Sequence, residues 1–337
     1  MAWRLKCRRC GFELSSEEYA PFCPKCKSPL DLTGEPPRSP RILGEGFTPE
    51  VIREFGSARV VFKLEYLNPS GSFKDRGSAT SLWLAKSLGF DCVVEDSSGN
   101  TGLSVAMYSR ALGLKSYIIV PKTAGLGKKL LLRALGANLI ETGTREEALE
   151  KAISMADKCF YVAHVYSPIF VEGISSIALE LSKYAEAGYD FLVPTSSGTL
   201  LLGLYFGFKR LGLKPRLIAV QASEASPLAS EVEVLARIGG STSRLADALV
   251  VKHPPRLSDM VNAIKDTKGG VVVVGDKAIK NALRELLRMG FIVEPSSAVV
   301  WAAFKALNER GITRNTVMPL TGSGLKYGEV LSGVSDE

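Results

Sequence analysis

The sequence predicts an α/β fold in which strands and helices alternate around parallel sheets. Short apolar runs such as residues 117–120 recur along the chain, and most are followed by a longer helix-like segment. Repeated strand–helix units of this kind favour doubly wound architectures. The chain of 337 residues, with 46% hydrophobic and 23% charged residues, has the composition of a globular protein and the length for about two or three domains.

The expected elements follow one another with little interruption. Strands are rich in Val, Ile or Phe, and each helix follows a loop of small polar residues. We expect strands at residues 60–66, 92–95, 117–120, 138–140, 160–163, 191–193, 217–220, 271–274 and 317–320. We expect helices at residues 78–88, 101–112, 128–135, 144–158, 171–185, 200–211, 276–289 and 296–310. Ligands of such folds bind in the loops that follow the strands.

Charge and hydropathy argue against two classes of protein, nucleic-acid-binding and membrane-spanning. The net charge of +7 is modest, and apart from a small N-terminal basic cluster the basic residues are scattered, which argues against a nucleic-acid partner. The longest apolar region, around residues 191–208, is interrupted by the polar loop 194–199. We therefore expect no membrane-spanning segment, no signal peptide and a cytoplasmic location.

The six cysteines fall into two groups. Two CxxC pairs lie near the N-terminus, a spacing typical of a tetrahedral zinc ribbon, and they comprise Cys7, Cys10, Cys23 and Cys26. A structural zinc site is the favoured interpretation, because a short polar segment needs such support, and a ribbon that folds without metal is the alternative. Cys92 and Cys159 lie in apolar strand-like runs, and we expect buried thiols there, since a reducing cytoplasm disfavours disulfides.

Four loops carry the candidate chemistry. Lys74 lies in a turn of small residues (68–77) between a strand and a helix, and three polar loops (96–102, 194–199 and 321–324) each follow a strand. Taken singly, the lysine could be a surface residue and each loop a plain helix N-cap. Together they provide an amine, anion-binding helix N-termini and hydroxyl groups, which suit a lysine-bound cofactor with a phosphate and a polar ring, namely pyridoxal phosphate. Only two histidines are present, which argues against a histidine-centred triad.

These motifs resemble those of a known enzyme family. Residues 69–77 (PSGSFKDRG), 97–102 (SSGNTG) and 321–324 (TGSG) are similar to threonine synthases, in the tryptophan-synthase-β class (fold type II) of pyridoxal phosphate enzymes. Residues 44–49 (GEGFTP), 172–173 (EG) and 294–298 (EPSSA) match further elements of the same family, as does the cysteine ribbon. The resemblance implies a ribbon-like segment at 1–34, a large domain of 35–77 and 186–337, a small domain of 78–185, and a homodimer.

The resemblance also implies a role for each matching residue. Lys74 would bind the cofactor covalently and move protons, Phe73 would pack near its ring, and Asn100 would donate a hydrogen bond to its 3′-oxygen. Thr321 would face the pyridine nitrogen. The cofactor phosphate would be bound by Thr195, Ser196, Ser197, Gly198 and Thr199. The substrate carboxylate would be bound by Ser97, Ser98 and Thr101.

The implied reaction converts O-phospho-L-homoserine and water into L-threonine and phosphate. One position departs from the family: Phe170 stands where an arginine that helps to bind the substrate phosphate is expected, and arginine and phenylalanine are not interchangeable in this role. Arg76, Lys122, Lys128 or Lys129 are the candidates to supply the charge. The alternatives are a serine/threonine dehydratase, a β-replacement enzyme such as a cysteine synthase, and a catalytically idle zinc-ribbon protein that contacts nucleic acid.

Overall fold

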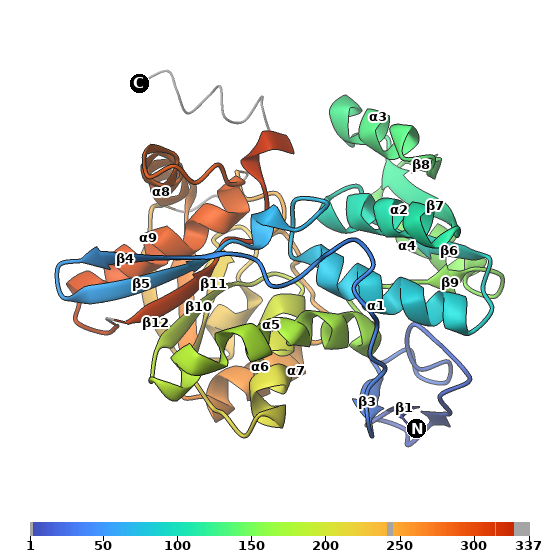
Figure 1. The fold of residues 1–337 in the computed structure, drawn as a ribbon, viewed down its shortest axis with the longest axis horizontal. Helices are drawn as coiled ribbons and strands as arrows, with labels where there is room; N and C mark the ends of the chain where they lie inside the picture. The colour runs from blue at the N-terminus through green and yellow to red at the C-terminus, as the bar shows by residue number, and fades with distance from the viewer. Residues whose placement is uncertain (1–2, 241–244, 314, 327–337) are drawn as a thin grey trace. The chain divides into compact units, whose positions relative to one another are not determined.

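The computed structural model describes residues 3–240, 245–313 and 315–326 (Figure 1). The chain forms two compact units. Unit 1 comprises residues 1–46 and 74–174, and unit 2 comprises residues 47–73 and 175–337. The expected domain boundaries at 34/35, 77/78 and 185/186 differ from these points, and that assignment stays a prediction. The chain passes from unit 2 to unit 1 between Phe73 and Lys74.

Unit 1 contains a four-stranded parallel sheet in the order β8-β7-β6-β9. Its strands are β6 (Cys92–Glu95), β7 (Lys115–Pro121), β8 (Asn138–Thr142) and β9 (Phe160–Tyr161). Its helices are α1 (Lys74–Ser87), α2 (Asn100–Leu112), α3 (Leu126–Ala134), α4 (Arg145–Met155) and the first part of α5 (Pro168–Glu186). Val94 and Ile119 pack with the buried alanines of α4 in one apolar cluster, as the alternation of side chains along parallel strands requires.

The N-terminal segment adds a small antiparallel sheet to unit 1. It is ordered β2-β1-β3 and consists of β1 (Arg4–Lys6), β2 (Glu13–Leu14) and β3 (Asp31–Thr33). The segment is anchored by aromatic residues: the ring of Tyr19 stacks on Phe160 with a centroid separation of 3.8 Å, and Phe22 joins the apolar cluster beneath α4. The ribbon therefore shares the core of unit 1.

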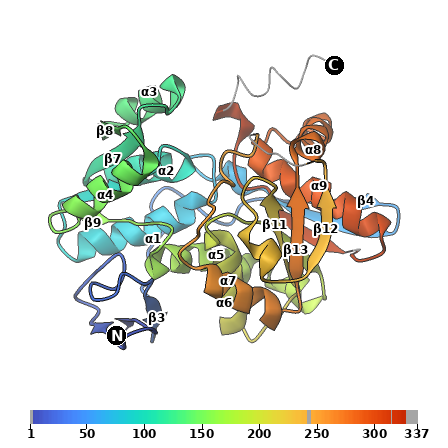
Figure 2. The same cartoon turned by 180° about the vertical axis from the view of Figure 1, so that it is seen from behind.

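Unit 2 contains a seven-stranded sheet in the order β12-β13-β11-β10-β14-β5-β4 (Figure 2). The strands are β4 (Glu50–Phe55), β5 (Ala58–Lys63), β10 (Asp190–Pro194), β11 (Leu217–Ala222), β12 (Val234–Ile238), β13 (Gly270–Val274) and β14 (Thr316–Pro319). The helices are the rest of α5, α6 (Thr199–Arg210), α7 (Leu257–Asp266), α8 (Asp276–Arg288) and α9 (Pro295–Glu309). Short 3₁₀ turns lie at Glu65–Leu67, Pro227–Ser230 and Gly324–Lys326.

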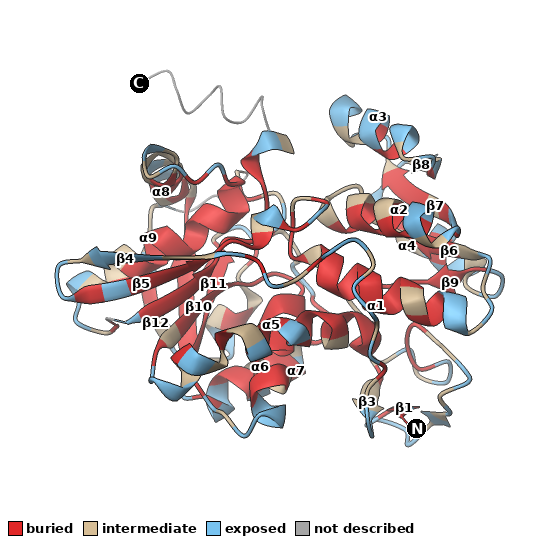
Figure 3. Cartoon of the chain, viewed as in Figure 1, coloured by how far each residue is buried: buried red, intermediate tan, exposed pale blue. Residues whose placement is uncertain are grey.

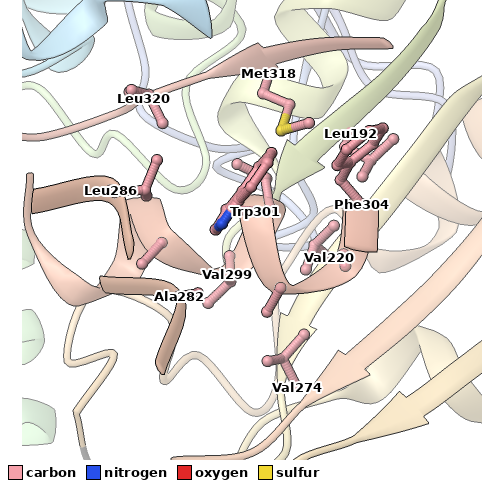
Figure 4. Close-up of a cluster of buried hydrophobic side chains, with 14 of the residues drawn as sticks. Leu192, Val220, Val274, Ala282, Leu286, Val299, Trp301, Phe304, Met318 and Leu320 are labelled. Carbon is pink, nitrogen blue, oxygen red and sulfur yellow. The ribbon is translucent and has the colours of Figure 1, made fainter. Parts of the chain in front are cut away.

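The two faces of this sheet bury alternate residues. Leu192, Val220 and Val274 point into the cluster formed with Trp301 and Phe304 of α9 (Figure 4). Their sequence neighbours face the other side, where Phe191 meets Phe208 of α6 with a centroid separation of 4.9 Å. Burial on both faces explains the nearly continuous apolar strands (Figure 3).

The structure corrects the expectation of purely parallel sheets. β4 pairs with β5 in antiparallel register, through a hairpin whose loop contains Gly56 at φ 62°. Its polar residues lie at the sheet edge, so the strand lacks the apolar run used to find the others. We also did not predict β12 and α7.

The expectation of two free buried thiols in the sheet of unit 1 is wrong. Cys92 and Cys159 form a disulfide bond. The pairing of β6 with β9 explains it, because the register that matches Val93 with Phe160 places these two cysteines opposite each other, with a Cα separation of 4.8 Å.

Candidate functional site

Lys74 is the first residue of α1 and is partly buried. The peptide directly before it is fixed within unit 2: the backbone N–H of Phe73 donates to the carbonyl oxygen of Thr321 at 3.1 Å, and Ser72 forms a β-bridge with Gly322. The lysine therefore directly follows, in the chain, a residue that is held against the Thr321 loop.

In unit 1, Lys74 is close to an aromatic side chain. Its Nζ lies 5.8 Å from the centre of the Phe170 ring, within the range of a cation–π interaction. Phe170 is fully buried, and a Cβ atom added at Gly77 would approach its ring to 2.5 Å. Gly77 therefore makes room for the ring, one turn of helix after the lysine.

The charges proposed to replace the missing arginine differ in availability. Lys129 is mostly buried, and its Nζ donates to Glu141 and to the carbonyl oxygen of Lys122, both within unit 1. Arg76 is also buried, whereas Lys122 is exposed. Because Lys129 already has a carboxylate partner, we no longer count it among the candidates.

The loop 96–102 turns tightly into α2, with Asn100 as the first helical residue. The backbone N–H of Gly99 donates to Ser97 Oγ at 3.3 Å. A Cβ atom at Gly102 would lie 1.8 Å from the Ser97 carbonyl oxygen, so only glycine permits this approach. Thr101 is buried, whereas Ser97 and Ser98 are partly exposed, as a role in contacting a ligand requires.

A hydrogen bond connects the lysine helix with this loop's helix. Ser104 Oγ, in the second turn of α2, donates to the buried carboxylate of Asp75 at 2.6 Å. Because Asp75 adjoins Lys74 and Ser104 follows Asn100 by one turn, unit 1 holds the predicted lysine and the predicted Asn100 loop on two helices that pack together.

A cluster of titratable residues, which the sequence reasoning missed, lies where β6 ends. Glu95 is fully buried, and its Oε1 lies 2.6 Å from Nδ1 of His164. The next residue, Asp96, accepts a hydrogen bond from the Tyr161 hydroxyl at 2.8 Å. The available signal was a pair of acidic residues closing an apolar strand, together with one of only two histidines.

In unit 2, the predicted phosphate loop joins β10 to α6. Gly198 has φ 89°, and a Cβ atom there would lie 2.2 Å from Met260 Sδ, so the loop needs glycine. Ser196 Oγ accepts a hydrogen bond from the backbone N–H of Val251 at 3.1 Å. Helix α6 begins at Thr199, and the N–H groups of its first turn have no acceptor within the helix, as an anion site requires.

The hydroxyl of Thr321 is part of a short network. It lies 3.0 Å from Ser297 Oγ, which also accepts a hydrogen bond from the backbone N–H of Gly322 at 3.0 Å. The strands β10 and β14 are parallel neighbours, so the loops that follow them leave the same edge of the sheet. Unit 2 thus brings the phosphate loop and the Thr321 loop to one edge.

The predicted site residues therefore fall into two groups. Unit 1 holds Lys74 and the loop with Ser97, Ser98, Asn100 and Thr101. Unit 2 holds Phe73, Thr321 and the loop with Thr195, Ser196, Ser197, Gly198 and Thr199. These groups fit pyridoxal phosphate: they provide an amine, a glycine-containing loop at a helix N-terminus that suits a phosphate, and an uncharged hydroxyl group.

The four ribbon cysteines also converge. Their Sγ atoms all lie within 4.8 Å of one another. Each CxxC pair ends in a similar turn, in which the N–H of Gly11 donates to the carbonyl of Cys7, and that of Lys27 to the carbonyl of Cys23. Four thiol groups in this arrangement match the ligand set of a structural zinc ion.

No helix among the residues that the structure describes is long and apolar enough to span a membrane.

Comparison with known proteins identifies the family. Residues 44–322 match the family described as "Pyridoxal-phosphate dependent enzyme". The threonine synthase of Methanocaldococcus jannaschii is 30% identical over 318 residues, which cover 88% of this chain and 78% of the relative. That of Methanosarcina acetivorans is 26% identical, with 99% and 95% of the two chains covered.

Solved structures show the same fold at lower identity. O-ureido-L-serine synthase superimposes with a TM-score of 0.75 at 22% identity, covering 88% of this chain and 95% of that one. A fungal L-serine ammonia-lyase from Rhizomucor miehei has a TM-score of 0.71 at 23% identity, with coverages of 82% and 93%. The chain therefore belongs to the pyridoxal-phosphate dependent enzymes, in the group that contains the threonine synthases.

Proposed function

We propose that this enzyme is a lyase that converts O-phospho-L-homoserine and water into L-threonine and phosphate. The observation that carries the proposal is the long alignment with threonine synthases, which spans nearly all of both chains in one case. The lysine, the asparagine loop and the phosphate loop support it, because each has the local geometry that the cofactor needs.

Each residue has a proposed task. Lys74 binds the cofactor through Nζ, Asn100 donates to the 3′-oxygen, and Thr321 contacts the pyridine nitrogen. The loop 195–199 binds the phosphate with backbone N–H groups and hydroxyls. Ser97, Ser98 and Thr101 orient the substrate by its carboxylate. When bound, pyridoxal phosphate withdraws electrons from the amino-acid carbons, which makes their protons removable.

The protein supplies the proton transfers. Nζ of Lys74 accepts a proton in its neutral form and returns it later, so one amine serves more than one step. The hydroxyl of Thr321 has no negative charge with which to keep the pyridine nitrogen protonated. This moderates the electron withdrawal and suits elimination and replacement.

The test is product analysis with O-phospho-L-homoserine. We expect threonine and phosphate in equal amounts, and neither product from Lys74→Ala. Borohydride reduction of the loaded protein, followed by peptide mapping, should place the cofactor on Lys74. Ammonia and a 2-oxo acid from serine or threonine, without threonine from phosphohomoserine, would contradict the proposal.

Phe170 favours a second candidate, a serine/threonine dehydratase or a β-replacement enzyme such as a cysteine synthase. The side chain is fully buried and apolar, so this position offers no charge to a substrate phosphate. The same product analysis separates the two candidates, since an acetylated or free serine would then be the better substrate.

We further propose that Cys7, Cys10, Cys23 and Cys26 bind a structural zinc ion. Their converging thiols support it. Elemental analysis should find one zinc per chain in the wild type and none in Cys10→Ser. A homodimer in the cytoplasm is proposed from the family alone, and light scattering would test the dimer.

A further inference from the structure

The pair Glu95–His164 lies deep in unit 1 and has no part in the proposed cofactor contacts. Glu95 Oε1 and His164 Nδ1 are 2.6 Å apart, which is a short hydrogen bond. Glu95 is fully buried, and its Oε2 has no hydrogen-bond partner among the residues that the structure describes. An ionised carboxylate would be poorly solvated there, so a protonated carboxyl group is favoured.

The protonation of the pair follows from its surroundings. Burial raises the pKa of Glu95 to about 8, and burial lowers the pKa of His164 to about 3. At neutral pH the carboxyl group therefore keeps its proton and donates it to Nδ1, which leaves the imidazole proton on Nε2. Four charged or titratable groups interact electrostatically with the pair, namely Asp96, Lys74 and the hydroxyl groups of Tyr161 and Tyr19.

The pair is electrostatically connected to Lys74. The His164 ring is 5.9 Å from the Phe170 ring, and the Lys74 amine is 5.8 Å from the centre of the same ring. The positive charge of Lys74 lowers the pKa of both Glu95 and His164. Because such coupling is reciprocal, an ionised Glu95 would favour the ammonium form of Lys74, and an uncharged Glu95 would not.

We propose that Glu95 and His164 hold one proton between them and act as positioning residues that leave Lys74 in its reactive, uncharged form. His164 provides an acceptor without a charge, so Glu95 can stay protonated beside the lysine. This inference rests on the proposed role of Lys74 as the cofactor lysine.

The test measures the reactivity of Lys74 in the full-length protein freed of cofactor. Reductive methylation, followed by peptide mapping, reports the fraction of uncharged Lys74 amine. At about pH 6.5, wild type and Glu95→Gln should react alike, since the side chain at position 95 is uncharged in both proteins. At about pH 9.5 the variant should react faster than the wild type, by up to about tenfold, because only the wild type then carries an anion there.

The control is Glu150→Gln, an exposed carboxylate on α4 in the same unit; it should match the wild type at both pH values. The deciding quantity is the methylation rate of Lys74 in Glu95→Gln divided by that in the wild type. If this ratio is the same at both pH values, the proposal is overturned, whatever the value of the ratio. Failure of the proposed function is separate, since it would appear as cofactor attached to a lysine other than Lys74 after borohydride reduction.

A second measurement reads the histidine directly. The chain contains two histidines, so a protein with nitrogen-labelled histidine gives two sets of ring signals, and His253→Gln assigns them. His164 should remain a neutral Nε2–H tautomer from about pH 5 to about pH 7, where Glu95 keeps its proton. An imidazolium signal at neutral pH would show an ion pair instead and would overturn the proposal.

Discussion

The substitution Glu95→Gln should change how the stability of the protein depends on pH. Burial raises the pKa of Glu95 from 4.5 to about 8, and burial lowers the pKa of His164 from 6.5 to about 3. In the native protein the pair therefore retains one proton from about pH 3 to about pH 8. The unfolded chain holds two protons on these residues below about pH 4.5, one up to about pH 6.5, and none above it.

The sign follows from comparing the two states. Stability rises with pH where the unfolded chain binds more protons and falls where the native protein binds more. The pair's contribution should rise up to about pH 4.5, stay level to about pH 6.5 and fall from there to about pH 8. The fall spans about 1.5 pH units, which at about 1.4 kcal/mol per unit amounts to about 2 kcal/mol.

Urea unfolding at about pH 6.5 and about pH 8, followed by circular dichroism, measures the effect. The wild type should lose about 2 kcal/mol more than Glu95→Gln between the two pH values, because the glutamine does not ionise. Burial raises the pKa of Asp96 to about 6, and because Asp96 is present in both proteins, its titration contributes to both losses. Equal losses in the two proteins would refute the assignment of a protonated Glu95.

Three further predictions concern single contacts. Gly198→Ala should weaken cofactor binding in a titration by more than tenfold, whereas Gly212→Ala, which has the same sign of φ but no atom within 4 Å of its Cβ, should not. Cys92→Ser should lower the free energy of unfolding by about 3–4 kcal/mol, because the disulfide closes a long loop; unchanged stability in denaturant would argue against the bond. Lys63→Ala should cost about 3–5 kcal/mol, since it removes a buried ammonium group that lies 2.7 Å from the buried carboxylate of Glu180, and a loss below about 1 kcal/mol would contradict this.

The features that the sequence predicted are local in the chain. The lysine turn, the asparagine loop and the phosphate loop each form from consecutive residues, so their hydroxyls, glycines and following helices are visible in order. The strands that are buried on both faces could also be predicted from the sequence, because each is a continuous apolar run.

Most of the features that were missed depend on partners distant in the chain. β4 is the exception, since it is polar and is a strand because it pairs with β5, the other strand of its hairpin. The need for glycine at Gly198 depends on Met260, and the place of Phe170 depends on Gly77. The disulfide depends on the register of two strands that the sequence does not specify.

The identity of its partner, His164, explains how the buried Glu95 can lie near Lys74, the cofactor lysine that we propose. A lysine or arginine beside Glu95 would keep the carboxylate ionised and would place a second charged group in the buried surroundings of the pair. With no partner, the carboxyl group would lack an acceptor for its proton in a fully buried place. A neutral imidazole meets both conditions, because its Nδ1 accepts the proton and adds no charge. His164 thus suits the uncharged Lys74 that we propose, whereas packing alone would be satisfied by a phenylalanine.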